Sequence, residues 1–138
     1  MIPQKIAFAS VDFLKKKVYN QNEVIKLKVA VIGSRGISVD NLKNYMPQGI
    51  SEIVSGGARG VDNCAAKYAK QHNIKITEFL PNYEIFGKGA PIKRNEQIVD
   101  YADMVVALWD GVSRGTKSVI DMCAKKGKRC DVFIIGGK

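Results

Sequence analysis

Four short segments of the sequence combine glycine, hydroxyl and arginine residues, the types that bind phosphate and ribose groups. They span residues 33–36, 55–62, 93–96 and 110–116 of the 138-residue chain. Taken alone, any one of them is an ordinary turn. If the fold brings all four together, a phosphate-containing ligand such as a nucleotide is the expected occupant.

The segment 55–62, Ser-Gly-Gly-Ala-Arg-Gly-Val-Asp, organises the rest of the chain. It follows a short β-type run and opens an alanine-rich helical pattern, so backbone N–H groups and the helix dipole favour an anion there. Gly56 and Gly57 lack a Cβ, which lets a phosphate approach the backbone closely. Arg59 offers a bidentate side-chain contact. The alternative is a plain strand-to-helix turn in which Asp62 starts the helix.

Short apolar runs alternate with helical patterns from residue 28 onward. We expect strands at 29–32, 52–55, 74–80, 104–109 and 130–135, helices at 39–45, 61–72, 91–101 and 115–126, and an irregular loop at 81–89. This alternation predicts a Rossmann-like α/β fold of about five parallel strands with helices on both faces. In such a sheet the ligand binds beyond the carboxyl ends of the strands, near the switch point of the topology. All four segments are expected at that edge.

The predicted ligand-binding residues all belong to these segments. They are Gly33, Ser34, Arg35, Gly56, Gly57, Ala58, Arg59, Gly60, Asp62, Arg94, Asn95, Asp110, Ser113, Gly115 and Thr116. Arg94, Glu96 and Asp110 are the candidates for any catalytic step. Glu96 is expected to pair with Arg94 or with a ribose hydroxyl.

Composition and length predict one main domain, 28–138, preceded by an N-terminal extension, 1–27, of open role. No apolar run approaches the ~18 residues of a membrane span, and the first residues lack a signal-peptide core. We therefore expect a cytoplasmic protein with no membrane partner. With three cysteines outside any C-x-x-C spacing and a single histidine, no metal site is expected.

The formal net charge of +9 favours an anionic partner. Residues 1–27 carry five basic against two acidic residues, and the remainder carries 17 against 11. Because this excess is spread along the chain, it supports a nucleic-acid groove only weakly. The extension also has apolar residues suited to a sheet edge or a partner subunit, which leaves a homo-oligomer open.

The same motifs carry a family resemblance. Lys-Val-Ala-Val-Ile-Gly-Ser-Arg at 28–35, the segment 55–62, Arg94-Asn95 and Trp-Asp-Gly-x-Ser-Arg-Gly-Thr at 109–116 resemble the YspA-type branch of the SLOG superfamily. That superfamily includes the LOG nucleoside-monophosphate phosphoribohydrolases and the DNA-processing protein DprA. The resemblance covers about residues 28–135. It implies a Rossmann-like domain that binds or senses nucleotides or nucleotide-derived ligands.

The chain departs from the LOG enzymes at one position. Their P-G-G-x-G-T-x-x-E signature ends in a catalytic glutamate, and aligning its G-T with Gly115-Thr116 places Val119 there. Asp121 lies two residues further, about 200° around a helix. Arg94 resembles the family's arginine. We therefore expect a binding or sensing domain. Phosphoribohydrolase activity with a carboxylate from elsewhere is the alternative, and DprA-like nucleic-acid binding is a further one.

Overall fold

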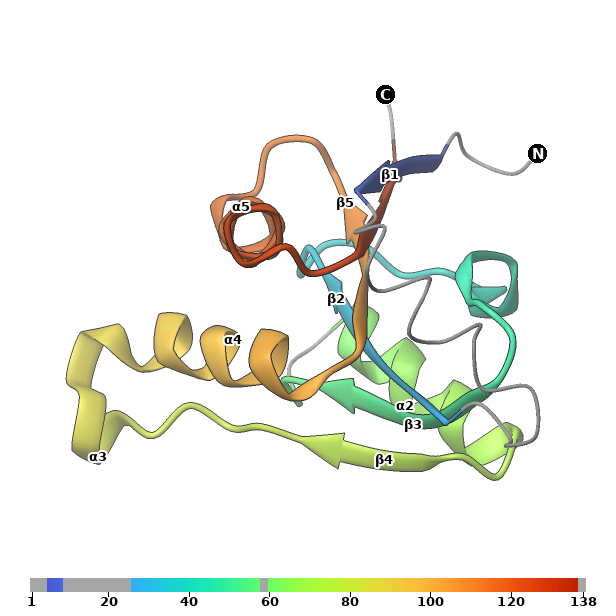
Figure 1. Ribbon diagram of the computed structural model, residues 1–138, viewed down its shortest axis with the longest axis horizontal. Coiled ribbons are helices and arrows are strands. Elements are labelled where there is room, and N and C mark those ends of the chain that lie inside the picture. The colour runs from blue at the N-terminus through green and yellow to red at the C-terminus, as the bar shows by residue number, and fades with distance from the viewer. Residues whose placement is uncertain (1–4, 9–25, 58–59, 137–138) are drawn as a thin grey trace.

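The alternation of strands and helices expected from residue 28 onward is present in the computed structural model (Figure 1). The structure describes residues 5–8, 26–57 and 60–136. Its strands are β1 (Lys5–Phe8), β2 (Leu27–Gly33), β3 (Ile50–Ser55), β4 (Lys75–Glu78), β5 (Met104–Trp109) and β6 (Cys130–Ile134). Its helices are η1 (Leu42–Tyr45), α2 (Val61–Gln71), α3 (Tyr83–Phe86), η2 (Gly87–Gly89), α4 (Ala90–Tyr101) and α5 (Arg114–Lys126).

The strands form one sheet in the order β1-β6-β5-β2-β3-β4. Strands β2 to β6 run parallel to one another, which confirms the predicted parallel sheet and the Rossmann-like fold. Strand β1 pairs antiparallel with β6, with Ile6 opposite Val132. Part of the extension 1–27 therefore continues the sheet of the main domain.

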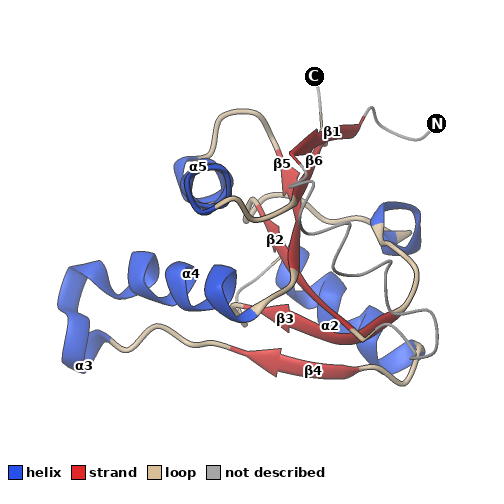
Figure 2. Cartoon of the chain, in the orientation of Figure 1, coloured by secondary structure: helices blue, strands red, loops and turns tan. Residues whose placement is uncertain are grey.

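The central strand β2 separates two buried clusters. Val29 and Val31 belong to one cluster, and Ala30 and Ile32 belong to the other. Successive side chains of a strand point to opposite faces, so a strand covered on both faces needs an uninterrupted apolar run. Helices α2 and η1 contribute to the first cluster, and α4 and α5 contribute to the second. Figure 2 shows α4 and α5 on one side of the strands and η1 on the other.

Helix α5 illustrates how the sequence sets a helix and its end. Its buried residues Thr116, Val119, Ile120 and Cys123 recur three and four positions apart, so they form one stripe that faces the core. Gly127 then ends the helix with a φ of 69°. Glycine adopts this left-handed conformation without the penalty that a Cβ imposes.

Two segments differ from the expectation. The helix expected at 39–45 is reduced to the short 3-10 helix η1, and the loop expected at 81–89 contains α3 and η2. Asn82 caps α3 by accepting a hydrogen bond from the Ile85 N–H at 3.1 Å. A single local bond of this kind starts a short helix that apolar periodicity does not reveal. Pro91 lies in the first turn of α4, as expected.

Candidate functional site

A cleft of about 470 Å³ opens at the carboxyl edge of the sheet, between β2 and β5. Strand β2 leads on to β3, which lies on one side of the β2–β5 pair. Strand β5 leads on to β6, which lies on the other side. The connections that follow β2 and β5 therefore diverge, which is how a ligand crevice arises in this type of sheet.

The cleft collects most of the residues that the sequence predicted. Eleven of them line it, namely Gly33, Ser34, Arg35, Gly56, Asp62, Arg94, Asn95, Asp110, Ser113, Gly115 and Thr116. Gly57 and Gly60 are not among the lining residues. Ala58 and Arg59 lie outside the described residues.

Four further lining residues were not predicted as ligand-binding residues. They are Ile32, Gly36, Pro91 and Ile98. Ile98 lies four residues after Arg94 on α4, so helical spacing places both on the same face. That spacing was visible in the sequence, whereas an isoleucine carries no chemical signal for a binding site.

A pair of serine hydroxyls joins the two diverging connections. The Oγ atoms of Ser34, after β2, and Ser113, after β5, are 2.5 Å apart and share a hydrogen bond. Ser34 Oγ also accepts a hydrogen bond from the Asp110 N–H at 3.3 Å. These bonds hold the two segments in contact, so predicted motifs 79 residues apart become one surface.

Asp110 organises the loop that leads into α5. Its Oδ1 accepts hydrogen bonds from the N–H groups of Ser113 at 2.7 Å and Val112 at 2.9 Å. These two bonds, that from Ser113 first, lower the pKa of the Asp110 carboxyl below its ordinary value. Gly111, between Asp110 and Val112, takes a φ of 87°, a conformation that favours glycine. The carboxylate therefore remains ionised at neutral pH.

The first turn of α5 faces the same cleft. The first hydrogen bond of the helical ladder joins the Lys117 N–H to the Ser113 carbonyl at 3.3 Å, and the Ser113 side chain makes no capping bond. The N–H groups of residues 114–116 precede that bond, and an α-helix supplies them with no acceptor. Gly115 and Thr116 line the cleft. This turn is therefore suited to an anionic group.

The side chain of Arg94, on α4, reaches the glycine turn that follows β3. Its Nη1 donates to the Gly56 carbonyl at 3.0 Å, and its Nε donates to Asn95 Oδ1 at 2.8 Å. These bonds hold the guanidinium at the cleft. A Cβ at Gly56 would lie 2.6 Å from Arg94 Nη1, so the glycine makes room for the arginine.

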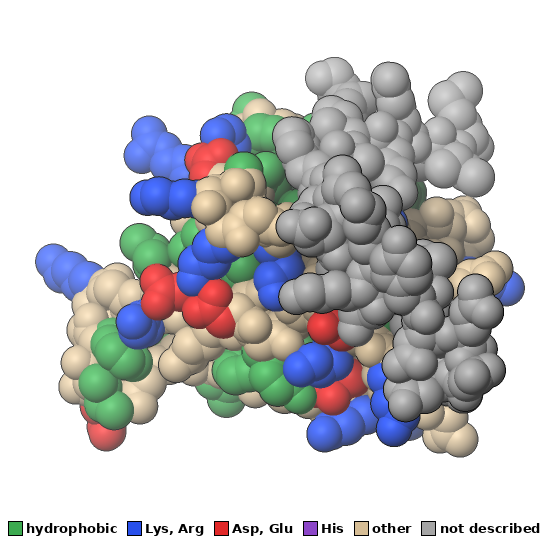
Figure 3. All heavy atoms as spheres, viewed as in Figure 1, with side chains coloured by type: hydrophobic (Ala, Val, Ile, Leu, Met, Phe, Trp, Pro, Cys, Tyr) green, Lys and Arg blue, Asp and Glu red, His purple; other side chains and the backbone are tan. Residues whose placement is uncertain are grey.

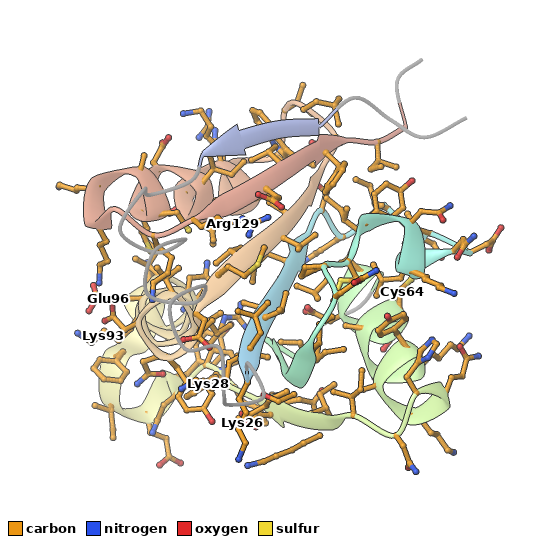
Figure 4. The ribbon with its side chains drawn as sticks, turned by 45° about the vertical axis from the view of Figure 1, so that its right-hand side comes forward. Lys26, Lys28, Cys64, Lys93, Glu96 and Arg129 are labelled. Atoms are coloured by element: carbon orange, nitrogen blue, oxygen red, sulfur yellow. The ribbon has the colours of Figure 1, made fainter. Side chains whose placement is uncertain are left out.

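The expected pairing of Glu96 with Arg94 is wrong. Glu96 Oε1 instead accepts a hydrogen bond from Lys93 Nζ at 3.1 Å, and Glu96 does not line the cleft. Figure 4 shows these two side chains together, on the side of α4 away from the strands. Residues two apart on a helix differ by about 200° in direction, which explains the separation of Arg94 from Glu96. Of the three catalytic candidates, only Arg94 and Asp110 line the cleft.

Gly60 shapes the backbone beside the cleft. It adopts a φ of 70° at the start of α2, and a Cβ there would lie 2.7 Å from the Arg35 carbonyl oxygen and 2.8 Å from that of Ile37. The glycine is therefore required for the connection after β2 to pack against the start of α2.

Neither of the two positions compared with the LOG glutamate lines the cleft. Val119 is fully buried in the cluster beneath α5. Asp121 is exposed, and its Oδ1 is 2.8 Å from Lys117 Nζ. The carboxylates that line the described part of the cleft are Asp62 and Asp110.

No protein-family model matches this chain, and it matches neither a curated protein nor a solved structure. Among the described residues, no group of three or more His, Cys, Asp or Glu side chains is arranged to hold a metal ion. None of the described helices is long and apolar enough to cross a membrane. The class that the fold defines is a Rossmann-like α/β domain, and its ligand is inferred from the cleft.

Proposed function

We propose that this chain binds a nucleotide or a nucleotide-derived ligand in the cleft. The observation that carries the proposal is the convergence of the first turn of α5, the Ser34–Ser113 hydroxyl pair and Arg94 on one cavity. Backbone N–H groups, hydroxyls and a guanidinium are the groups that bind phosphate oxygens. The volume of about 470 Å³ lies within the range of small-molecule sites.

The charges of the cleft favour a small ligand over a nucleic-acid strand. The charged side chains of the described lining are two arginines and two aspartates, namely Arg35, Arg94, Asp62 and Asp110. A groove that follows a nucleic-acid backbone needs an excess of positive charge. A balanced lining suits a ligand with one anionic end and hydroxyl groups that donate to carboxylates, which describes a nucleotide.

A thermal-shift screen tests the proposal. The panel contains nucleoside mono-, di- and triphosphates, dinucleotides and ADP-ribose. A ligand at about 100 times its Kd stabilises the folded protein by about 2.7 kcal/mol. If no member of the panel raises the melting temperature, the proposal is wrong.

Arg94→Ala locates the binding in the cleft. Loss of a charge-assisted hydrogen bond should weaken binding by about 1.5–3 kcal/mol. The free protein should also lose about 1–3 kcal/mol of stability, because Arg94 Nη1 donates to the carbonyl of the buried Gly56, so affinities are compared at a temperature where both variants are folded. Lys67→Ala is the matched control, since it removes one positive charge from an exposed position on α2, outside the cleft lining. Equal affinities of the two variants would place the ligand elsewhere.

N-glycosidic cleavage of a nucleoside monophosphate is the second candidate, and Asp110 is the observation that favours it. Its ionised carboxylate lines the cleft, where it would stabilise positive charge that develops at the sugar. Val119 has no such group. The assay is release of free base, with ribose 5-phosphate measured in parallel. We expect no release by the wild type. Turnover near 1 s⁻¹ that Asp110→Asn abolishes would establish the enzyme instead.

A further inference from the structure

Residues 80–92, here called the arm, form an exposed apolar surface. Of the seven large hydrophobic side chains that are exposed in the described part of the chain, five belong to the arm, with exposed fractions from 39% to 71%. They are Leu80, Tyr83, Ile85, Phe86 and Ile92. Concentrated apolar exposure of this kind marks an interaction surface, whereas single exposed residues are ordinary.

The arm projects from one end of the molecule. It comprises α3, the turn η2 and the start of α4, and Figure 1 shows it beyond the ends of the strands. Gly87 reverses the chain between α3 and α4 with a φ of 55°. Figure 3 shows hydrophobic side chains at the surface of this end of the molecule. The described elements of the chain therefore leave this apolar surface open to a partner.

The charge of the arm decides what kind of partner fits. Its only charged residues are Glu84 and Lys88, so its net charge is zero within a chain of net charge +9. Lys93, which follows the arm, is paired with Glu96 at 3.1 Å. Anionic lipid, nucleic acid and acidic proteins attract positive patches, which the arm lacks. Two copies of a basic chain repel each other least where their surfaces are locally neutral.

We propose that the arm is a self-association surface that packs against the arm of a second copy. A two-fold arrangement buries the same patch on both copies, and its opposite charges can then meet across the axis. Large aliphatic and aromatic residues at the centre, with few charges, are typical of such interfaces. The inference does not depend on the ligand, because the five exposed residues of the arm do not line the cleft.

Sedimentation equilibrium of the full chain over a range of concentrations tests this proposal. The wild type should approach twice the 15.2 kDa chain mass. Ile85→Glu and Ile92→Glu, at positions 71% and 60% exposed, should each raise the dissociation constant at least about tenfold. Val112→Glu is the matched control, because Val112 is 80% exposed and lies outside the arm.

The melting temperature of each variant at low concentration separates loss of association from loss of folding. A wild type that stays monomeric at all concentrations overturns the proposal, and so does association that both arm variants retain. Co-sedimentation with anionic lipid vesicles in place of self-association would assign the arm to a membrane surface, and would also overturn it.

Discussion

Two polar clusters in this molecule contain similar groups but differ in the partners that are available for their hydrogen bonds. At the cleft, the hydroxyls of Ser34 and Ser113 lie beside the first turn of α5, in a cavity open to a ligand. Within the sheet, Glu52 on β3 is buried, and its Oε2 accepts hydrogen bonds from Thr77 Oγ1 at 2.7 Å and Tyr101 Oη at 2.5 Å. We call these the open cluster and the closed cluster.

The hydrogen bonds and the ion pair of the closed cluster all come from protein groups, and they shift its pKa values. Burial raises the pKa of Glu52, but hydrogen bonds from Tyr101 and Thr77 outweigh burial, so this pKa lies below its ordinary value. The bond to Glu52 raises the pKa of Tyr101. Lys75 Nζ lies 3.7 Å from the other oxygen of Glu52. A carboxylate with this many protein donors stabilises the fold and has little left to offer a ligand.

The comparison predicts separate effects on stability and on binding, and Glu52→Ala should have the largest effect. It removes two hydrogen bonds to a charged group, each worth about 1.5–3 kcal/mol. The free energy of unfolding in urea should fall by about 3 kcal/mol, with nucleotide affinity unchanged. Glu96→Ala, which removes a carboxylate from the outer side of α4, is the control and should cost less than about 1 kcal/mol. Equal losses would show that the closed cluster contributes no special stability.

Removing one hydroxyl from each cluster should have effects of intermediate size, on affinity in the open cluster and on stability in the closed cluster. Ser113→Ala in the open cluster should weaken nucleotide binding about tenfold and cost only about 0.5 kcal/mol of stability, because its hydroxyl bonds one neutral hydroxyl, that of Ser34, at the open cleft. Thr77→Val in the closed cluster removes a hydrogen bond to a charged carboxylate, so it should lower the free energy of unfolding by about 1.5 kcal/mol and leave affinity unchanged. Calorimetric titration measures the affinity of both variants, and urea unfolding measures their free energy of unfolding. If both variants lost the same property, the distinction between the clusters would fail.

The smallest expected effect is on the pH dependence of stability. The lowered pKa of Glu52 in the folded state contributes stability above the pKa of the unfolded chain, and this contribution is lost as pH falls through the folded pKa. Below about pH 5, the wild type should therefore lose stability more steeply than Glu52→Gln. Urea unfolding between pH 3 and 7 would test the expectation, and parallel curves would refute it.

The open cluster was largely predictable from sequence because its residues follow strands. Residues after the carboxyl end of a parallel strand must emerge at one edge, so motifs at 33–36 and 110–116 could be expected to meet there. Their contact through Ser34 and Ser113 fits that expectation. The closed cluster was not predicted, because Glu52, Thr77 and Tyr101 carry no shared motif. Only strand register and the path of α4 bring them together.

The same distinction explains the residues that were misplaced. The type of Glu96 suggested an ion pair with Arg94, but the direction in which each side chain leaves α4 separates them. Gly57 and Gly56 are neighbours in one motif, yet only Gly56 lines the cleft. A strand-to-helix turn changes direction at every residue, so composition identifies the turn without identifying which of its atoms face the cavity.

The sequence by itself determined the order of strands β2 to β6 and of helices α2, α4 and α5, the parallel sheet and the edge at which its glycine, hydroxyl and arginine residues gather. Those features follow from apolar periodicity and chain connectivity, which are local or nearly so. The tertiary structure alone decided that Ser34 meets Ser113, that Arg94 is held by Gly56, that Glu52 is enclosed by Tyr101 and that the arm stands exposed. These contacts join residues distant in sequence or depend on side-chain direction, and packing rather than local preference determines them.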